Sequence, residues 1–166
     1  MAKLFKTSDD IFEFINKAWQ ETTCAQVGIN LKIMSTPKAK QILKLSKESA
    51  RTEFLIREEK IITLVVYEKA WDLLDELNQM LLIKGIFSLV NYDLEHDKII
   101  IDNRPYADLF NMRHCCDMEG NEYLDKYDNA LEIAAMAISQ IERDEVEVKN
   151  MERERKRQEK DKKKAK

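Results

Sequence analysis

The sequence predicts an α+β fold, in which a small mixed or antiparallel sheet of roughly three to four strands is packed by helices and followed by a long C-terminal helix. Two strand patterns support this prediction, a period-two alternation in residues 29–35 and a β-branched run in residues 61–67. Helical spacing of apolar residues in 8–20 and 124–141 indicates the helices. Glycine and proline number only three and two, which disfavours a barrel or sandwich built on tight turns.

Residues 8–20 are expected to form an amphipathic helix, because their apolar members recur along one helical face. That face consists of Ile11, Phe12, Ile15, Ala18 and Trp19. Thr7 or Ser8 is placed to cap the helix with its hydroxyl oxygen. Asp9 and Asp10 then lie in the first turn, where negative charge suits the helix dipole.

Three segments are predicted to be strands. Residues 29–35 alternate as a half-buried strand does, and Pro37 ends the pairing because it has no N–H to donate. Residues 61–67 are rich in β-branched side chains, which suits a central strand buried on both faces. Residues 99–101 form a further short strand, whereas residues 40–58 are consistent with either a helix or a strand.

Helical spacing returns in residues 68–83, so a helix is predicted there. Residues 92–98 are polar and are predicted to form a connector. Another helix is expected after Asp102, with Pro105 near its first turn. Gly120 is predicted to break the chain before the last helix.

The last helix has the clearest periodicity in the chain. Two sets of residues recur at intervals of seven and are offset by three, as heptad a and d positions are: Leu124, Tyr127, Leu131, Ala134, Ile138 and Ile141. The pattern is shorter than the three to four heptads typical of a coiled coil. It therefore favours a helix packed on its own domain, and the alternative is a homodimer through these residues.

Charge is distributed unevenly along the chain. Residues 152–166 hold nine Lys or Arg and four Asp or Glu, and the whole chain carries −3, so residues 1–151 carry −8. We expect one α+β domain over residues 1–148 and a basic helical or disordered tail over residues 149–166. Candidate residues for binding nucleic acid or another partner are Arg153, Arg155, Lys156, Arg157, Lys160, Lys162, Lys163 and Lys164. The interleaved acidic residues favour the alternative of a solvated tail.

A strand at residues 64–67 is followed by Glu68-Lys69-Ala70-Trp71 and then by a helical stretch that reaches Leu82. This order resembles the SprT-like metallopeptidase family encoded by bacteriophages, over residues 60–90. In that family a strand precedes a tryptophan-containing helix start, and the helical stretch that follows carries His-Glu-x-x-His. The two histidines bind zinc and the glutamate is the general base. The resemblance implies a bacteriophage protein on a metallopeptidase-like scaffold.

The chain departs from the family where the metal motif belongs. Aligned on the stretch after Leu82, the first histidine falls at Lys84, the glutamate at Gly85 and the second histidine at Ser88. A protonated lysine cannot ligate zinc, and glycine offers no base. We therefore expect a degenerate member of the family that lacks catalytic and metal-binding residues and needs no cofactor.

Few other residues are candidates for metal binding or nucleophilic catalysis. The cysteines are Cys24, Cys115 and Cys116, an odd number that does not form a disulfide framework and suits a reducing compartment. His114 precedes the cysteine pair, but consecutive residues point apart on a helix and rarely chelate one ion. A cysteine paired with His114 is the basis for the alternative of a residual hydrolase.

The function predicted from these observations is that of a non-catalytic, phage-type accessory protein. Its acidic domain would engage a protein partner, and its basic tail would contact nucleic acid or an acidic surface. A virion-associated structural or cargo protein is the alternative. No apolar stretch approaches the ~18 residues that span a bilayer, so no membrane contact is expected. The expected location is the host cytoplasm or the virion.

Overall fold

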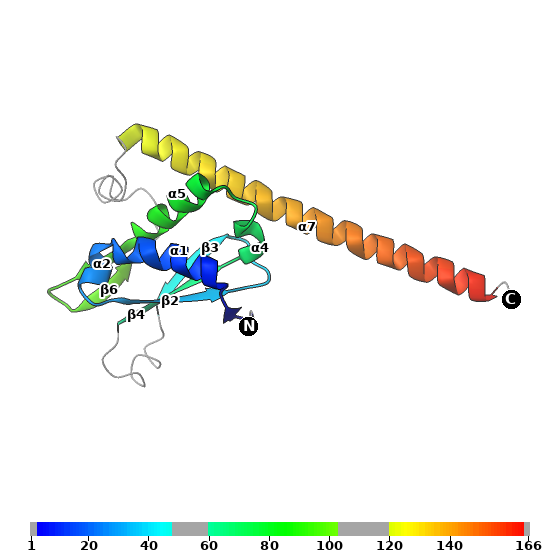
Figure 1. Cartoon of the computed structure of the whole chain (residues 1–166), viewed down its shortest axis with the longest axis horizontal. Helices are drawn as coiled ribbons and strands as arrows, with labels where there is room; N and C mark the ends of the chain where they lie inside the picture. The colour runs from blue at the N-terminus through cyan, green and yellow to red at the C-terminus, as the bar shows by residue number, and fades with distance from the viewer. Residues whose placement is uncertain (1–2, 48–59, 103–119, 165–166) are drawn as a thin grey trace.

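The computed structural model describes residues 3–47, 60–102 and 120–164, and within the last helix it describes the side chains of residues 125–158. Its strands form a four-stranded sheet and a two-stranded sheet, and a long helix follows them (Figure 1). The predicted α+β class is confirmed, including the mixed sheet and the C-terminal helix.

The four-stranded sheet has the strand order β1-β2-β4-β3. Its strands are β1 (Phe5–Lys6), β2 (Asn30–Ser35), β3 (Leu43–Lys47) and β4 (Ile61–Val66). β2 runs parallel to β4, with Ile33 opposite Leu64, and the other neighbours are antiparallel. The strands predicted near residues 29–35 and 61–67 are confirmed, and β3 settles part of the segment that fitted either a helix or a strand.

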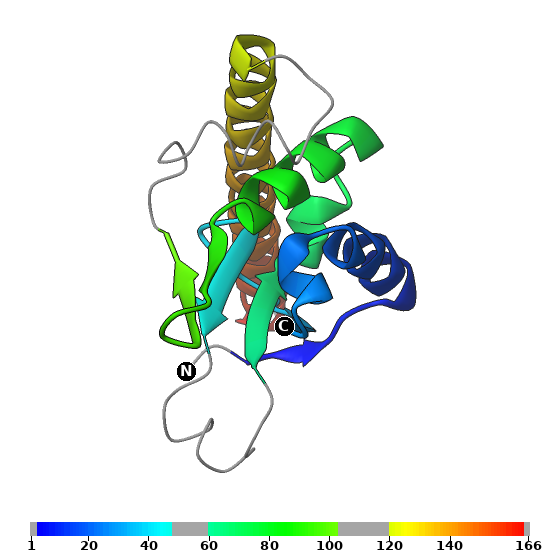
Figure 2. The same cartoon turned by 90° about the vertical axis from the view of Figure 1, so that its left-hand side faces the viewer.

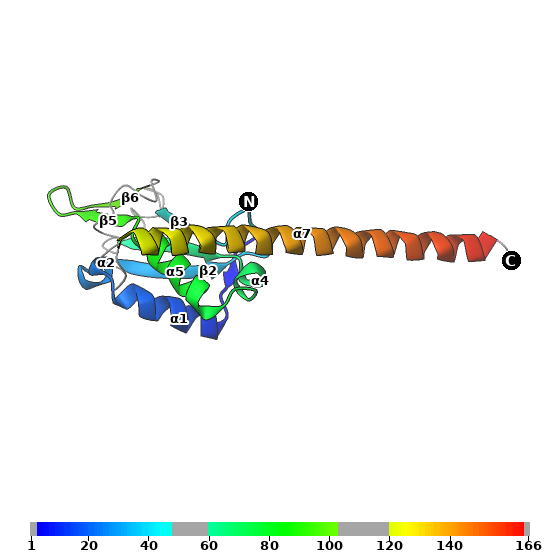
Figure 3. The same ribbon diagram turned by 90° about the horizontal axis from the view of Figure 1, so that it is seen from above.

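The core is built on β4, which has a neighbour on each side. Ile62, Leu64 and Val66 are fully buried, whereas Ile61 and Val65 on the opposite face are half-buried. Thr63, between them on that face, is buried at 8% exposure, so the prediction of burial on both faces is correct for one face and partly correct for the other. The helices gather on one side of this sheet, as Figures 1 and 3 show.

Helix α1 (Asp9–Gln20) buries the predicted apolar face against this sheet, except that Phe12 is 43% exposed. The capping prediction is wrong, because the Ser8 side chain makes no capping hydrogen bond. The Ser8 backbone N–H instead donates to Glu68 Oε1 at 2.9 Å, and Thr7 Oγ1 is buried without a hydrogen-bond partner. A short helix, α2 (Thr23–Gln26), follows and is capped by Thr22.

The helix predicted over residues 68–83 is in fact two helices, α4 (Glu68–Trp71) and α5 (Glu76–Phe87). Asp75 separates them, because its carboxylate oxygen accepts a hydrogen bond from the Asn78 backbone N–H at 2.8 Å. An aspartate that caps in this way begins a new helix. The apolar spacing continues across the break, so periodicity alone could not show it.

The polar connector predicted at residues 92–98 is correct for residues 94–97, which form the turn of a β-hairpin, and too wide at both ends, where the strands extend to Asp93 and from Lys98. Strands β5 (Val90–Asp93) and β6 (Lys98–Ile101) pair antiparallel, which confirms the short strand predicted at residues 99–101. The hairpin lies beside β3 (Figure 2). The helix predicted after Asp102 lies outside the described residues.

Helix α7 (Gly120–Lys164) is 45 residues long and begins at the glycine that was predicted to precede it. It crosses α5 and α4 and then continues well past the rest of the domain (Figures 1 and 3). The predicted tail is therefore helical through Lys164, continuous with the helix that packs on the domain.

Candidate functional site

The first half of α7 is held on the domain by close packing. Tyr127, Ala130, Ala134 and Ile138 are buried. A Cβ added to Gly85 of α5 would lie only 2.0 Å from Tyr127 Cε2, so the tyrosine ring rests directly on the glycine. Small residues permit such close approach of two helices.

This packing bears on the two alternatives for the heptad pattern. The helix packs on its own domain, as the favoured alternative predicted. Leu131 departs from the pattern, because it is 40% exposed while Ala130 is fully buried. The homodimer stays a prediction, and Tyr127, Ala134 and Ile138 of its seam already lie in the domain core.

The domain supports α7 as far as Glu145. Lys69 Nζ of α4 lies 3.6 Å from Glu145 Oε1. Burial raises the pKa of Tyr67, and the nearby carboxylates of Glu145 and Glu142 add to this shift. The two carboxylates therefore sit near the phenol at the start of α4. Beyond this junction, every side chain from Val146 to Gln158 is exposed.

The projecting part of α7 separates charge between its faces. Basic residues spaced three or four apart lie on one face of a helix. Seven follow this spacing, and we call them the basic stripe: Lys149, Arg153, Lys156, Arg157, Lys160, Lys163 and Lys164. Arg155 and Lys162 lie on the opposite side, and the acidic residues fall between the two. Helical geometry thus gathers most of the charge that the linear sequence shows as interleaved.

The structure places the predicted binding residues as follows. Arg153, Arg155, Lys156 and Arg157 are all exposed on the projecting helix. The remaining four lysines lie in its helical backbone, and their side chains are outside the described part. Lys149 was not among the predicted residues, although its spacing of four from Arg153 was a usable signal.

The positions that align with the metallopeptidase motif have packing and capping roles here. Gly85 accommodates the Tyr127 ring, and the Ser88 hydroxyl donates to the Gly85 carbonyl oxygen at 2.6 Å. Lys84 is half-buried in the last turn of α5. A glutamate at position 85 would project into the tyrosine ring.

Other candidates for metal or nucleophile chemistry are limited. Among the described residues, no group of three or more His, Cys, Asp or Glu side chains could hold a metal ion. His114, Cys115 and Cys116 lie outside the described residues. Cys24 is buried, and its thiol donates to the Val90 carbonyl oxygen at 3.4 Å.

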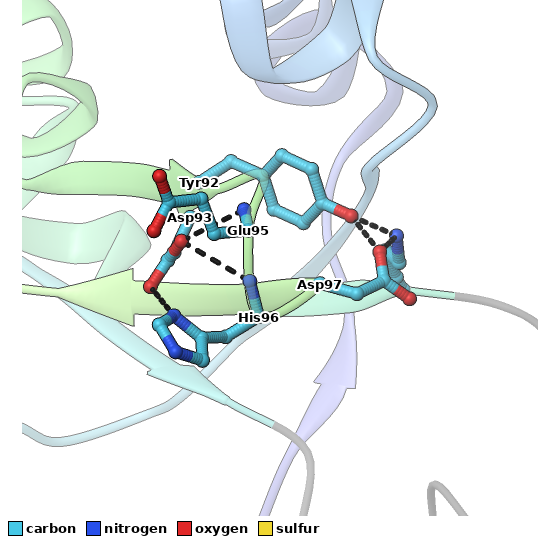
Figure 4. Close-up of polar contacts among 6 residues, drawn as sticks. Tyr92, Asp93, Glu95, His96 and Asp97 are labelled. Atoms are coloured by element: carbon cyan, nitrogen blue, oxygen red, sulfur yellow. Dashed lines mark hydrogen bonds and ion pairs between the residues drawn. The ribbon is translucent and has the colours of Figure 1, made fainter.

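The tip of the β5–β6 hairpin carries an exposed polar cluster (Figure 4). Asp93 Oδ1 accepts from the backbone N–H groups of Glu95 and His96 at 3.0 and 3.3 Å, and Asp93 Oδ2 lies 2.8 Å from His96 Nδ1. Asp97, at φ 50°, contacts both Lys60 and Tyr92. These contacts account for the turn itself, so the cluster is a turn-stabilising device.

The hairpin tip should open in acid. The hydrogen bond from His96 lowers the pKa of Asp93, and the hydrogen bond from Lys60 lowers that of Asp97. A depressed carboxyl pKa stabilises the folded form above the unfolded value of about 3.9, and this stabilisation disappears as pH falls through the folded pKa. NMR shifts of residues 91–100 should change below about pH 4. Asp93→Asn should weaken this response and Glu95→Gln should not; equal responses would contradict the assignment.

Comparison of the chain with known protein families, curated proteins and solved structures gave no match. The resemblance to the SprT-like family therefore stays a prediction. In the described part of the chain, none of the helices combines the length and the apolar character that a membrane span requires.

Proposed function

We propose that this protein is a non-catalytic binding protein that contacts duplex DNA through the basic stripe of its projecting helix. The observation that carries the proposal is the stripe itself, a set of Lys and Arg positions on one face of a helix that leaves the domain. Lys and Arg on an exposed helix neutralise phosphates and release their counterions, which favours binding without base contacts.

The geometry of α7 suits a duplex. Residues 149–164 span about 23 Å at ~1.5 Å per residue, and an α-helix fits the major groove of B-form DNA. No aromatic residue follows Tyr127 in the sequence, so stacking on unpaired bases is not offered by this segment. These features favour the phosphates of a duplex over a single strand.

The charge of the domain restricts binding to the projection. Residues 1–151 carry −8 against +5 for residues 152–166. An acidic body repels DNA, whereas a helix that extends beyond it moves its positive charge away from that field. Docking of the first half of α7 on the domain in turn supports the helix, because an isolated segment of this length is marginally stable.

The roles of Gly85 and Ser88 in packing and capping support a non-catalytic function. The SprT-like resemblance adds the proposal that the protein is a bacteriophage accessory factor. Neither point is needed for the DNA-binding test.

The test is fluorescence anisotropy of a labelled duplex of mixed sequence across a salt series. We expect the wild-type affinity to fall steeply with salt. Arg153→Gln with Lys156→Gln removes two positive charges from the stripe and should flatten the log–log salt slope by about 2, because each phosphate contact contributes about 1.

The matched control is Arg155→Gln with Lys162→Gln, which removes the same two residue types from the other side of the helix. It should leave the slope within about 0.5 of wild type, because those positions face away from the stripe. Equal losses in both variants would show a diffuse charge effect and contradict binding along the stripe. A wild-type protein that does not bind at low salt would reject the proposal outright.

A further inference from the structure

Opposite the basic stripe, the projecting helix carries an apolar face. The stripe of α7 residues that packs on the domain includes Ala134 and Ile141, and the next step of seven reaches Val148. Met151 lies one turn further on the same face. Val148 is 50% exposed and Met151 53%, because the domain ends near Glu145. Val148 thus continues one row of the α7 packing residues beyond the domain.

Acidic residues border this face on both sides. By helical spacing, Glu145 and Glu152 lie on one side of Val148 and Met151, and Glu147 and Glu154 lie on the other. One cation, Arg155, lies on the face itself, one heptad after Val148. Among the described side chains, no ion pair engages Glu147, Glu152 or Glu154 within the helix. These carboxylates are therefore free to meet charges on another molecule.

This charge pattern selects the partner. Two copies of α7 that meet along this face would bring their acidic borders together in either a parallel or an antiparallel pair, and like charges beside the apolar seam oppose pairing. A helix with Lys or Arg beside its own apolar residues would satisfy both the apolar positions and the carboxylates.

We propose that the face formed by Val148 and Met151, with its border of Glu145, Glu147, Glu152 and Glu154, docks a basic amphipathic helix of a different protein. Such a helix would lay its apolar residues over Val148 and Met151 and place its cations against the carboxylates. The face lies opposite the basic stripe, so one projection holds two partners at once. The docking stands independently of DNA binding.

The test uses a labelled synthetic peptide of about three heptads, with leucine at a and d and lysine at e and g. A second peptide carries glutamate in place of lysine. Anisotropy with the full chain should show binding of the lysine peptide only. Val148→Gln with Met151→Gln should weaken this binding at least about tenfold, which corresponds to losing part of two buried apolar side chains.

The chain offers a matched control in Met136 and Val146, which are 60% and 55% exposed on other faces of α7. Met136→Gln with Val146→Gln replaces the same residue types and should change the affinity by less than about twofold. Equal weakening by the two pairs would overturn the proposal.

Charge reversal separates docking from a general attraction of cations to an acidic protein. Glu147→Lys with Glu154→Lys should lose the lysine peptide and gain the glutamate peptide. Unchanged preference in that variant would contradict the proposal. A wild-type dimer in sedimentation that Val148→Gln with Met151→Gln dissolves would assign the face to a second copy and also overturn it. Arg153→Gln with Lys156→Gln should still bind the lysine peptide, so failure of the DNA proposal is distinguishable.

Discussion

Replacing Gly85 with alanine should destabilise the protein by about 1–3 kcal/mol, which is the usual cost of forcing an extra group into a packed core. The added Cβ would lie 2.0, 2.6 and 2.8 Å from three carbons of the Tyr127 ring. At an ordinary helix position the same change stabilises by about 1 kcal/mol, because alanine is the better helix former. The sign of the effect therefore reports whether α7 is packed on α5 as the structure shows.

Denaturant unfolding of four proteins measures this contact: wild type, Gly85→Ala, Tyr127→Ala and the double variant. Tyr127→Ala alone should cost about 3–5 kcal/mol, because it leaves a cavity in the core. In that background Gly85→Ala should be neutral or stabilising, since the ring that it strikes is gone. A coupling energy near zero would show that the two residues do not touch. A Gly85→Ala variant at least as stable as wild type would likewise contradict the close approach of α5 and α7.

The helices and strands with strong local periodicity could be predicted from the sequence. Boundaries that depend on one capping side chain could not. β4 and α1 follow from their own residues, because burial of one face imposes a repeat on the sequence. The break before Glu76 depends on the Asp75 cap. The helical spacing of apolar residues runs on across this position, so the pattern gives no sign of the break. The β5–β6 hairpin was hidden because its exposed turn residues are polar.

The candidate site could be predicted only as a set of charges. The sequence shows bases and acids interleaved after Met151, and their separation into faces requires that the helix persist through Lys164. That persistence depends on docking near Tyr127, a contact between residues far apart in the chain. Val148 and Met151 are apolar residues within this charged stretch. Their exposure could not be predicted, because the sequence does not show where along α7 the contact with the domain ends.

The second large effect is expected at Trp19, which connects α1 with α5 and with Ile29, the residue before β2. It is 1% exposed, its Nε1–H donates to the Ile29 carbonyl oxygen at 3.2 Å, and its ring meets Phe87 edge-on at 5.0 Å between centroids. Trp19→Ala should cost about 3–5 kcal/mol in unfolding free energy, because it removes the packing and leaves a cavity. Phe12→Ala on the exposed side of the same helix should cost well under half as much.

Trp19 also tests whether the domain sustains the projecting helix. If docking of α7 supports it, the helical circular dichroism signal and DNA binding of Trp19→Ala should be lost on heating in two transitions that coincide, at a lower temperature than in wild type. The reason is that an unsupported helix of this composition is only marginally stable. In Phe12→Ala, the midpoint temperatures of the circular dichroism and DNA-binding transitions should stay near those of wild type. DNA affinity that persists after the Trp19→Ala domain has unfolded would mean that the basic residues bind without a preformed helix, and the stripe would then lose its geometric role.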